Sequence, residues 1–89
     1  MAMNEIMDIE KEACKERLLS VMGKYIRYSI KYEINIMDER NDLGATNIQL
    51  VGLYNEYYYE YRSFNIKRAQ DIITKAEQLL AYRGIFKNV

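Results

Sequence analysis

Proline, histidine and tryptophan are all absent from this chain of 89 residues, and it contains a single cysteine. Without proline, the sequence lacks the residue that most strongly breaks helices, which favours long uninterrupted helices. Without histidine it cannot assemble a zinc site of the usual Cys/His kind, and the lone Cys14 excludes an intramolecular disulfide. We therefore expect a helical protein of the cytoplasm that binds no metal and no cofactor.

An excess of charge is also missing, because thirteen basic side chains balance thirteen acidic ones. A neutral chain has no general attraction to nucleic acid or to an anionic membrane. No apolar run of membrane-spanning length exists, and the N-terminal residues lack the basic and apolar regions of a signal peptide. With 49% hydrophobic and 29% charged residues, the composition is that of a folded chain. We expect one soluble domain over residues 1–89, without a membrane partner.

Apolar residues recur at helical spacing in two long stretches. On a helical wheel, residues 18–38 divide into an apolar face and an opposite polar arc. Residues 49–83 also divide into an apolar face and a polar face, and the apolar face keeps the same helical phase over the whole stretch. This pattern predicts two amphipathic helices. Their apolar faces include Leu18, Met22, Tyr25, Ile26 and Ile36 in the first stretch, and Leu50, Tyr54, Ala69, Ile72 and Leu80 in the second.

Residues between and after these stretches indicate where the helices end. Gly44 suits the left-handed position that follows a helix, and Thr46 with Gln49 forms a capping box that begins the next one. Gly84 is expected to close the second helix in the same way as Gly44 closes the first. The sequence thus predicts an all-α fold of two long antiparallel helices, a helical hairpin. The expected elements are a helix over about 3–42, a turn at about 43–46 and a helix over about 47–83.

Two helices of roughly 38 residues are each about 55 Å long. A single pair of that length leaves much of its apolar surface exposed. A second copy of the same chain covers both surfaces and doubles the core without new sequence. We therefore expect a homodimer that completes a four-helix bundle.

A different fold also fits part of the sequence. From residue 26 to residue 36, isoleucine and tyrosine alternate strictly with polar residues, which is typical of a β-strand. The tyrosines at 57–61 would supply a partner strand, with Gly23 ending a first helix and Asn65 beginning a last one. This α-β-β-α fold needs a hairpin loop of about ten residues, which is long for that role. It stays as the alternative.

A tyrosine-rich segment stands out at residues 54–61. Tyrosine joins a large apolar ring to a polar hydroxyl and is therefore a common anchor in protein interfaces. Most tyrosines of this segment lie on the apolar face of the predicted helix, whereas Tyr59 lies on the polar side. The predicted partner-binding residues are Tyr59, Tyr58, Glu56 and Arg62.

A short basic strip is formed by Lys24, Arg27 and Lys31, which are spaced i, i+3 and i+7. Such a strip is typical of a phosphate-binding site, and two copies in a dimer would double it. The neutral charge of the chain argues against nucleic-acid binding, because proteins of that class carry a clear positive excess. The strip therefore supports only an alternative function.

No combination of residues in the sequence indicates catalysis. Cys14 falls on the first apolar face, and no histidine is present to act as its base. Glutamates at helical spacing occur at 12 and 16 and at 56 and 60, but di-metal helical bundles also need histidine ligands. We expect that the protein is not an enzyme.

These observations together predict a small non-catalytic protein–protein interaction module. It would act as an adaptor, regulator or inhibitor by occupying a surface of a protein partner whose identity the sequence does not give. The alternatives are a nucleic-acid-binding dimer and a structural component of a larger assembly. The abundance of isoleucine, asparagine, lysine and tyrosine suits an accessory gene of a phage or mobile element.

Overall fold

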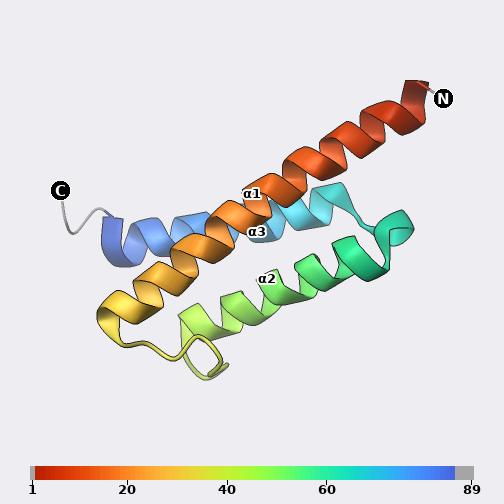
Figure 1. Cartoon of the computed structure of the whole chain (residues 1–89). Helices are drawn as coiled ribbons and strands as arrows, with labels where there is room; N and C mark the ends of the chain where they lie inside the picture. Colours follow the sequence, from red (N-terminus) through yellow and green to blue (C-terminus); the bar gives the residue numbers. More distant parts are fainter. Residues whose placement is uncertain (1, 86–89) are drawn as a thin grey trace.

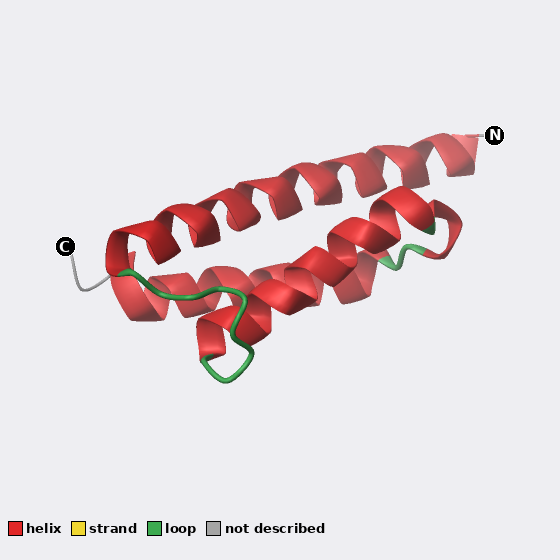
Figure 2. Cartoon of the chain, turned by 60° about the horizontal axis from the view of Figure 1, so that its bottom comes forward, coloured by secondary structure: helices red, strands yellow, loops and turns green. Residues whose placement is uncertain are grey.

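Three helices and the turns that join them make up the regular structure of residues 2–85. The computed structural model describes residues 2–85, and no strand occurs among them. Figure 2 shows α1 on one side of the molecule and α2 and α3 on the other, and all three helices contribute to one core (Figures 1 and 2). The elements are α1 (Ala2–Tyr32), α2 (Asp42–Tyr59), a 3-10 turn η1 (Tyr61–Ser63), α3 (Ile66–Leu80) and a π-helical turn η2 (Ala81–Ile85).

The predicted all-α class is confirmed, and the α-β-β-α alternative is wrong for residues 2–85. The prediction of two long helices is also wrong, because the described part of the chain forms three helices. α1 ends at Tyr32 instead of continuing to about residue 42. Glu33 has a φ of 55°, a left-handed conformation that interrupts the helix. A loop over 33–41 then leads to α2.

The residues predicted to form the turn, 43–46, lie in the first part of α2. The helix is capped by Asn41, whose side-chain oxygen accepts a hydrogen bond from the Gly44 amide at 2.6 Å. The cap expected at Thr46 is therefore displaced. Gly44 is required for close packing and not for a left-handed turn. A Cβ atom at Gly44 would lie 1.9 Å from the carbonyl oxygen of Asp38.

The second predicted helix is interrupted after Tyr59. Glu60 leaves the helical conformation, with φ −134° and ψ 45°, and η1 turns the chain. The side-chain oxygen of Asn65 then accepts a hydrogen bond from the Arg68 amide at 3.0 Å and caps α3. The capping role predicted for Asn65 is therefore confirmed, although in an all-helical chain.

Gly84 lies in η2, and its predicted left-handed conformation is wrong, because no glycine among residues 2–85 has a positive φ. The absence of a side chain at Gly84 matters for packing. A Cβ atom there would lie 2.5 Å from Cε2 of Tyr28. Gly84 therefore allows the ring of Tyr28 on α1 to approach the backbone of η2.

The core is built from one apolar stripe on each helix. Tyr25 is fully buried, and its hydroxyl donates a hydrogen bond to the carbonyl oxygen of Ala76 on α3 at 2.9 Å. The loop before α2 is held by Asn47, whose side-chain nitrogen Nδ2 donates a hydrogen bond to the carbonyl oxygen of Ile36 at 3.1 Å. The other buried apolar residues that the structure describes are Cys14, Leu18 and Val21 of α1, Leu43, Leu50, Leu53 and Tyr57 of α2, Phe64, and Ala69, Ile73, Ala76 and Leu80 of α3.

The close approach at Gly44 gives a matched test within one helix. We expect Gly44→Ala to lower the free energy of unfolding by about 2 kcal/mol, because the new Cβ overlaps the Asp38 carbonyl. Gly52→Ala should raise it by about 0.5–1 kcal/mol, because nothing lies within 4 Å of a Cβ there and alanine favours helix. Urea denaturation followed by circular dichroism measures both. Equal effects would contradict the steric role of Gly44.

Burial of Tyr25 predicts a loss of stability at high pH. Burial raises the pKa of this phenol to about 12, so the folded protein retains the proton longer than the unfolded chain does. Its contribution to stability is fully present below about pH 10 and is lost as the pH rises toward 12. Tyr25→Phe should cost about 1 kcal/mol near neutral pH, through the lost hydrogen bond to Ala76. The difference in unfolding free energy between wild type and variant should shrink above about pH 10; a constant difference would contradict this explanation.

Candidate functional site

α2 is uncharged around its whole circumference over most of its length. No charged residue occurs from Leu43 to Asn55. The inner side of the helix is buried in the core, but the outer side exposes Ile48, Val51 and Tyr58. A helix that is apolar on all sides is normally buried on all sides. In the part of the chain that the structure describes, no element covers this outer side.

The two flanks of α1 are distinguished by their ion pairs and hydrogen bonds. On one flank Arg17 pairs with Glu77 of α3 and donates a hydrogen bond to Thr74 at 2.8 Å. On the other flank Glu12 accepts a hydrogen bond from the hydroxyl of Tyr57 on α2. α1 therefore has one flank toward α3 and one toward α2.

Exposed apolar residues on α1 extend the outer side of α2. Leu19 and Ile26 follow Glu12 at intervals of seven residues, which places them on the flank toward α2. Ile30 follows Ile26 by one further helical turn. These residues and those on the outer side of α2 form what we call the uncharged face, whose side chains are between 38% and 73% exposed. Its members are Leu19, Ile26, Ile30, Ile48, Val51 and Tyr58.

The four predicted partner-binding residues do not form a single patch. Tyr58 and Tyr59 are exposed at the end of α2, and Tyr59 is 84% exposed. Glu56 points to the opposite flank of α2 and forms an ion pair with Arg68 of α3 at 2.8 Å. Arg62 lies in η1 and lines a separate hollow. Tyr58 is therefore the one residue of this set that belongs to the uncharged face, and Tyr59 follows it at the end of α2.

The tyrosine-rich segment also has a structural role at the corner between α2 and α3. The ring of Tyr57 packs edge-on against Tyr61 at 5.2 Å and against Phe64 at 5.4 Å, measured between ring centroids. Lys11 of α1 is only 5% exposed, and its ammonium donates to the carbonyl oxygen of Tyr61 at 2.7 Å. That ammonium lies 4.4 Å from the centroid of the Tyr61 ring, a cation–π contact. Nothing in the sequence marks Lys11 for this role, because its partner lies fifty residues away.

The same part of the structure shifts the pKa values of two hydrogen-bonded groups, Glu12 and Tyr57. The hydrogen bond from Lys15 holds the pKa of Glu12 below its ordinary value, and the Tyr57 hydroxyl adds to the effect. Burial raises the pKa of Tyr57 to about 12, with a further contribution from its hydrogen bond to Glu12. Both groups therefore keep the states, carboxylate and neutral phenol, in which their hydrogen bond forms.

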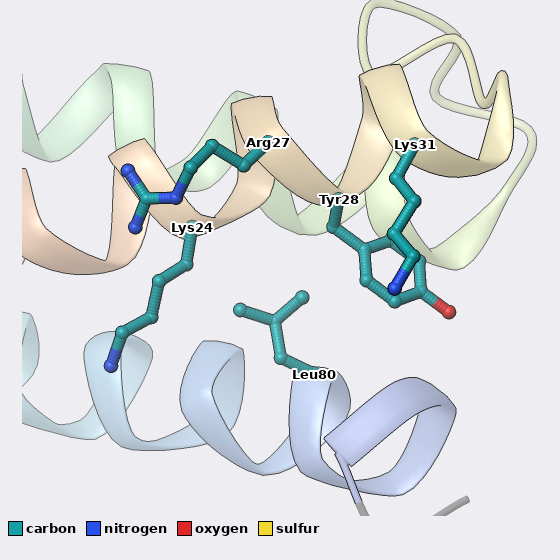
Figure 3. A pocket seen from close by; sticks show the side chains of 5 residues that line it. All are labelled: Lys24, Arg27, Tyr28, Lys31 and Leu80. Atoms are coloured by element: carbon teal, nitrogen blue, oxygen red, sulfur yellow. The ribbon is translucent and has the colours of Figure 1, made fainter. Parts of the chain in front are cut away.

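The basic strip lies beside a hollow of about 310 Å³ between α1 and α3. Lys24, Arg27 and Lys31 line it together with Tyr28 and Leu80 (Figure 3). In Figure 3, Leu80 points from α3 toward α1, between Lys24 on one side and Lys31 on the other. The structure thus brings all three predicted cations to one site. It also adds two apolar residues that the sequence did not assign to it.

Two findings bear on reaction chemistry and on membranes. Cys14 is buried, and burial raises the pKa of its thiol, which disfavours the reactive thiolate. Within residues 2–85, no three cysteine, aspartate or glutamate side chains are grouped so that they could hold a metal ion. No helix in the same part of the chain is both long enough and apolar enough to span a membrane.

No known protein-family model matches the sequence, and no curated protein or solved structure is significantly similar to it.

Proposed function

We propose that the protein is a non-catalytic protein–protein interaction module and that the uncharged face is its docking surface. The observation that carries the proposal is the outer side of α2, which exposes Ile48, Val51 and Tyr58 without a charged residue between Leu43 and Asn55. Apolar surface left in water costs free energy, and a contiguous exposed apolar patch is typical of an interaction site. A module of this kind acts as an adaptor, regulator or inhibitor by covering a surface.

A second copy of the chain is the partner that this face fits best. A face without charge neither repels nor misaligns its own copy, and a twofold axis would place α1 and α2 of one chain against those of the other. The molecule is 46 Å long. Two helices side by side are roughly 20 Å wide, so the face has room for the ~800 Å² per partner of a standard interface. We therefore infer a homodimer whose central layer is a bundle of four helices.

The dimer is tested by introducing one charge into the uncharged face. Sedimentation equilibrium of the wild type should give twice the chain mass of 10.6 kDa. We expect Val51→Glu to weaken dimerisation by at least about tenfold, because a buried, unpaired carboxylate opposes association. Gln70→Glu adds the same charge at an exposed position of α3 and should leave the dimer intact.

Two results would contradict this proposal. A wild type that stays monomeric up to about millimolar concentration, where association is worth only about 4 kcal/mol, excludes the second copy as partner. A dimer that Val51→Glu and Gln70→Glu weaken equally excludes the uncharged face as its interface. Circular dichroism of both variants establishes that each is folded.

A nucleic-acid-binding dimer is the second candidate. One observation favours it: among the described residues, Lys24, Arg27 and Lys31 form no ion pair, so their charges are available to phosphates.

This second candidate has a clear signature in its salt dependence. If the strip binds duplex DNA, log Kd should change with log salt concentration by about 0.9 for each phosphate contacted. Replacement of all three cations by glutamine should remove most of that slope. Fluorescence anisotropy with a short labelled duplex measures it, and absence of binding at about 50 mM salt rejects the candidate.

A further inference from the structure

The hollow beside the basic strip combines two kinds of surface that are seldom found together. Its base is apolar, because the side chain of Leu80 and the ring of Tyr28 line it. Its edge is cationic, because Lys24, Arg27 and Lys31 line it as well, and no acidic residue does. A ligand that matches both surfaces has an apolar part and an anionic group.

The positions of the cations follow from the register of α1. Lys24 and Lys31 come seven and fourteen residues after Arg17, so all three share the flank toward α3. Arg17 is neutralised by Glu77 of α3. Beyond that pair α3 offers Leu80, which is apolar, so the charges of Lys24 and Lys31 have no counterpart across the hollow (Figure 3).

A fourth cation strengthens the positive potential near the hollow. The guanidinium of Arg83 lies 5.9 Å from the centroid of the Tyr28 ring, and its distance to the carboxylate of Asp42 is 3.6 Å. Its Nη1 atom is buried without a hydrogen-bond partner among the described residues. Asp42 therefore offsets only part of the local charge.

The size of the hollow restricts the ligand further. At about 310 Å³ it lies at the small end of the range for small-molecule sites, roughly 300–1,000 Å³. A nucleic-acid backbone presents phosphates and sugars but no apolar group to fill the space against Leu80 and Tyr28. Inorganic phosphate is held by cations alone and likewise gains nothing from the apolar base.

We propose that the hollow between α1 and α3 binds a small amphipathic anion, a carboxylate or phosphate that carries an apolar chain or ring. The apolar part lies against Leu80 and Tyr28, where burial of its surface contributes about 25 cal/mol per Å². One of the two lysines that flank Leu80 donates charge-assisted hydrogen bonds to the anionic group, and the other lysine and Arg27 add to the positive potential around it. Lys24 and Lys31 lie on the flank of α1 toward α3, whereas the α1 residues of the uncharged face lie on the flank toward α2, so the site does not depend on the proposed dimer.

Three probes separate the contributions of the two surfaces. Isothermal titration calorimetry of the full chain with octyl phosphate, inorganic phosphate and 1-octanol compares the complete ligand with its head and its tail. We expect octyl phosphate to bind at least about tenfold more tightly than either of the others. Equal affinities for octyl phosphate and inorganic phosphate, or for octyl phosphate and octanol, would overturn the proposal.

Variants at the edge of the hollow locate the site. The double variant Lys24→Gln/Lys31→Gln should weaken octyl phosphate binding by at least about tenfold. Lys67→Gln removes an exposed cation at the other end of α3 and should change the affinity by less than about twofold. Unchanged binding by the double variant would overturn the proposal. Both lysines are exposed, so we expect the double variant to fold, and circular dichroism measures whether it does.

A chemical-shift map excludes binding elsewhere on the protein. Amide shifts induced by octyl phosphate should concentrate at residues 24–31 of α1 and around Leu80 of α3. Shifts concentrated at residues 48–58 would instead place the probe on the uncharged face and overturn the assignment. Displacement of octyl phosphate by a DNA duplex at equal phosphate concentration would also overturn the assignment, and it would identify nucleic acid as the ligand.

Discussion

The corner between α2 and α3 is the constraint on which the rest of the structure depends. If the chain continued as one straight helix after Tyr59, it could pack along only one side of α1. The corner sends the chain back, so that α2 and α3 cover adjacent parts of the α1 stripe. Two features hold it: the edge-on packing of Tyr57 against Tyr61 and Phe64, and the buried ammonium of Lys11 on the Tyr61 carbonyl. Because a buried ammonium without partners is costly, the corner and the N-terminal half of α1 stabilise each other.

Helical periodicity was sufficient to predict the class of the fold and much of its core. Leu18, Tyr25 and Leu50 are buried as their spacing predicts, because the 3.6-residue repeat records which side of a helix faces the interior. The corner was not predictable in this way, since the helical phase continues unbroken through residues 59–66. The break is held by packing of Tyr57 against Phe64 and by a hydrogen bond from Lys11, which lies fifty positions away. The first contact is between nearby residues but forms only once the chain has turned, and the second is not encoded locally. Gly44 was misassigned for a related reason, because its neighbour, the Asp38 carbonyl, is brought close by the loop.

The candidate sites likewise combine features that a single helix determines with features that depend on how the helices pack. The helical wheel was sufficient to predict that Tyr59 is exposed and that Lys24 and Lys31 share one side of α1, because each prediction concerns a single helix. It placed Glu56 in the partner surface, although that carboxylate pairs with Arg68 of α3. The apolar base of the hollow could not be predicted from the sequence either, because Leu80 meets the basic strip only after α3 has packed against α1.

The chain is synthesised from its N-terminus, so the distant partners of α1 are made well after α1 itself. The groups that join α1 to the rest of the protein are separated by fifty residues for Lys11 and Tyr61, and by sixty for Arg17 and Glu77. At a synthesis rate of about 5–20 residues per second, Glu77 is added about 3–12 s after Arg17. During that interval only α2 is available to cover the apolar stripe of α1, and the part of the stripe that α3 covers stays exposed. Each nascent molecule therefore passes through a stage in which a long amphipathic helix is open to chaperones and to other nascent chains, and the last third of the sequence ends that exposure.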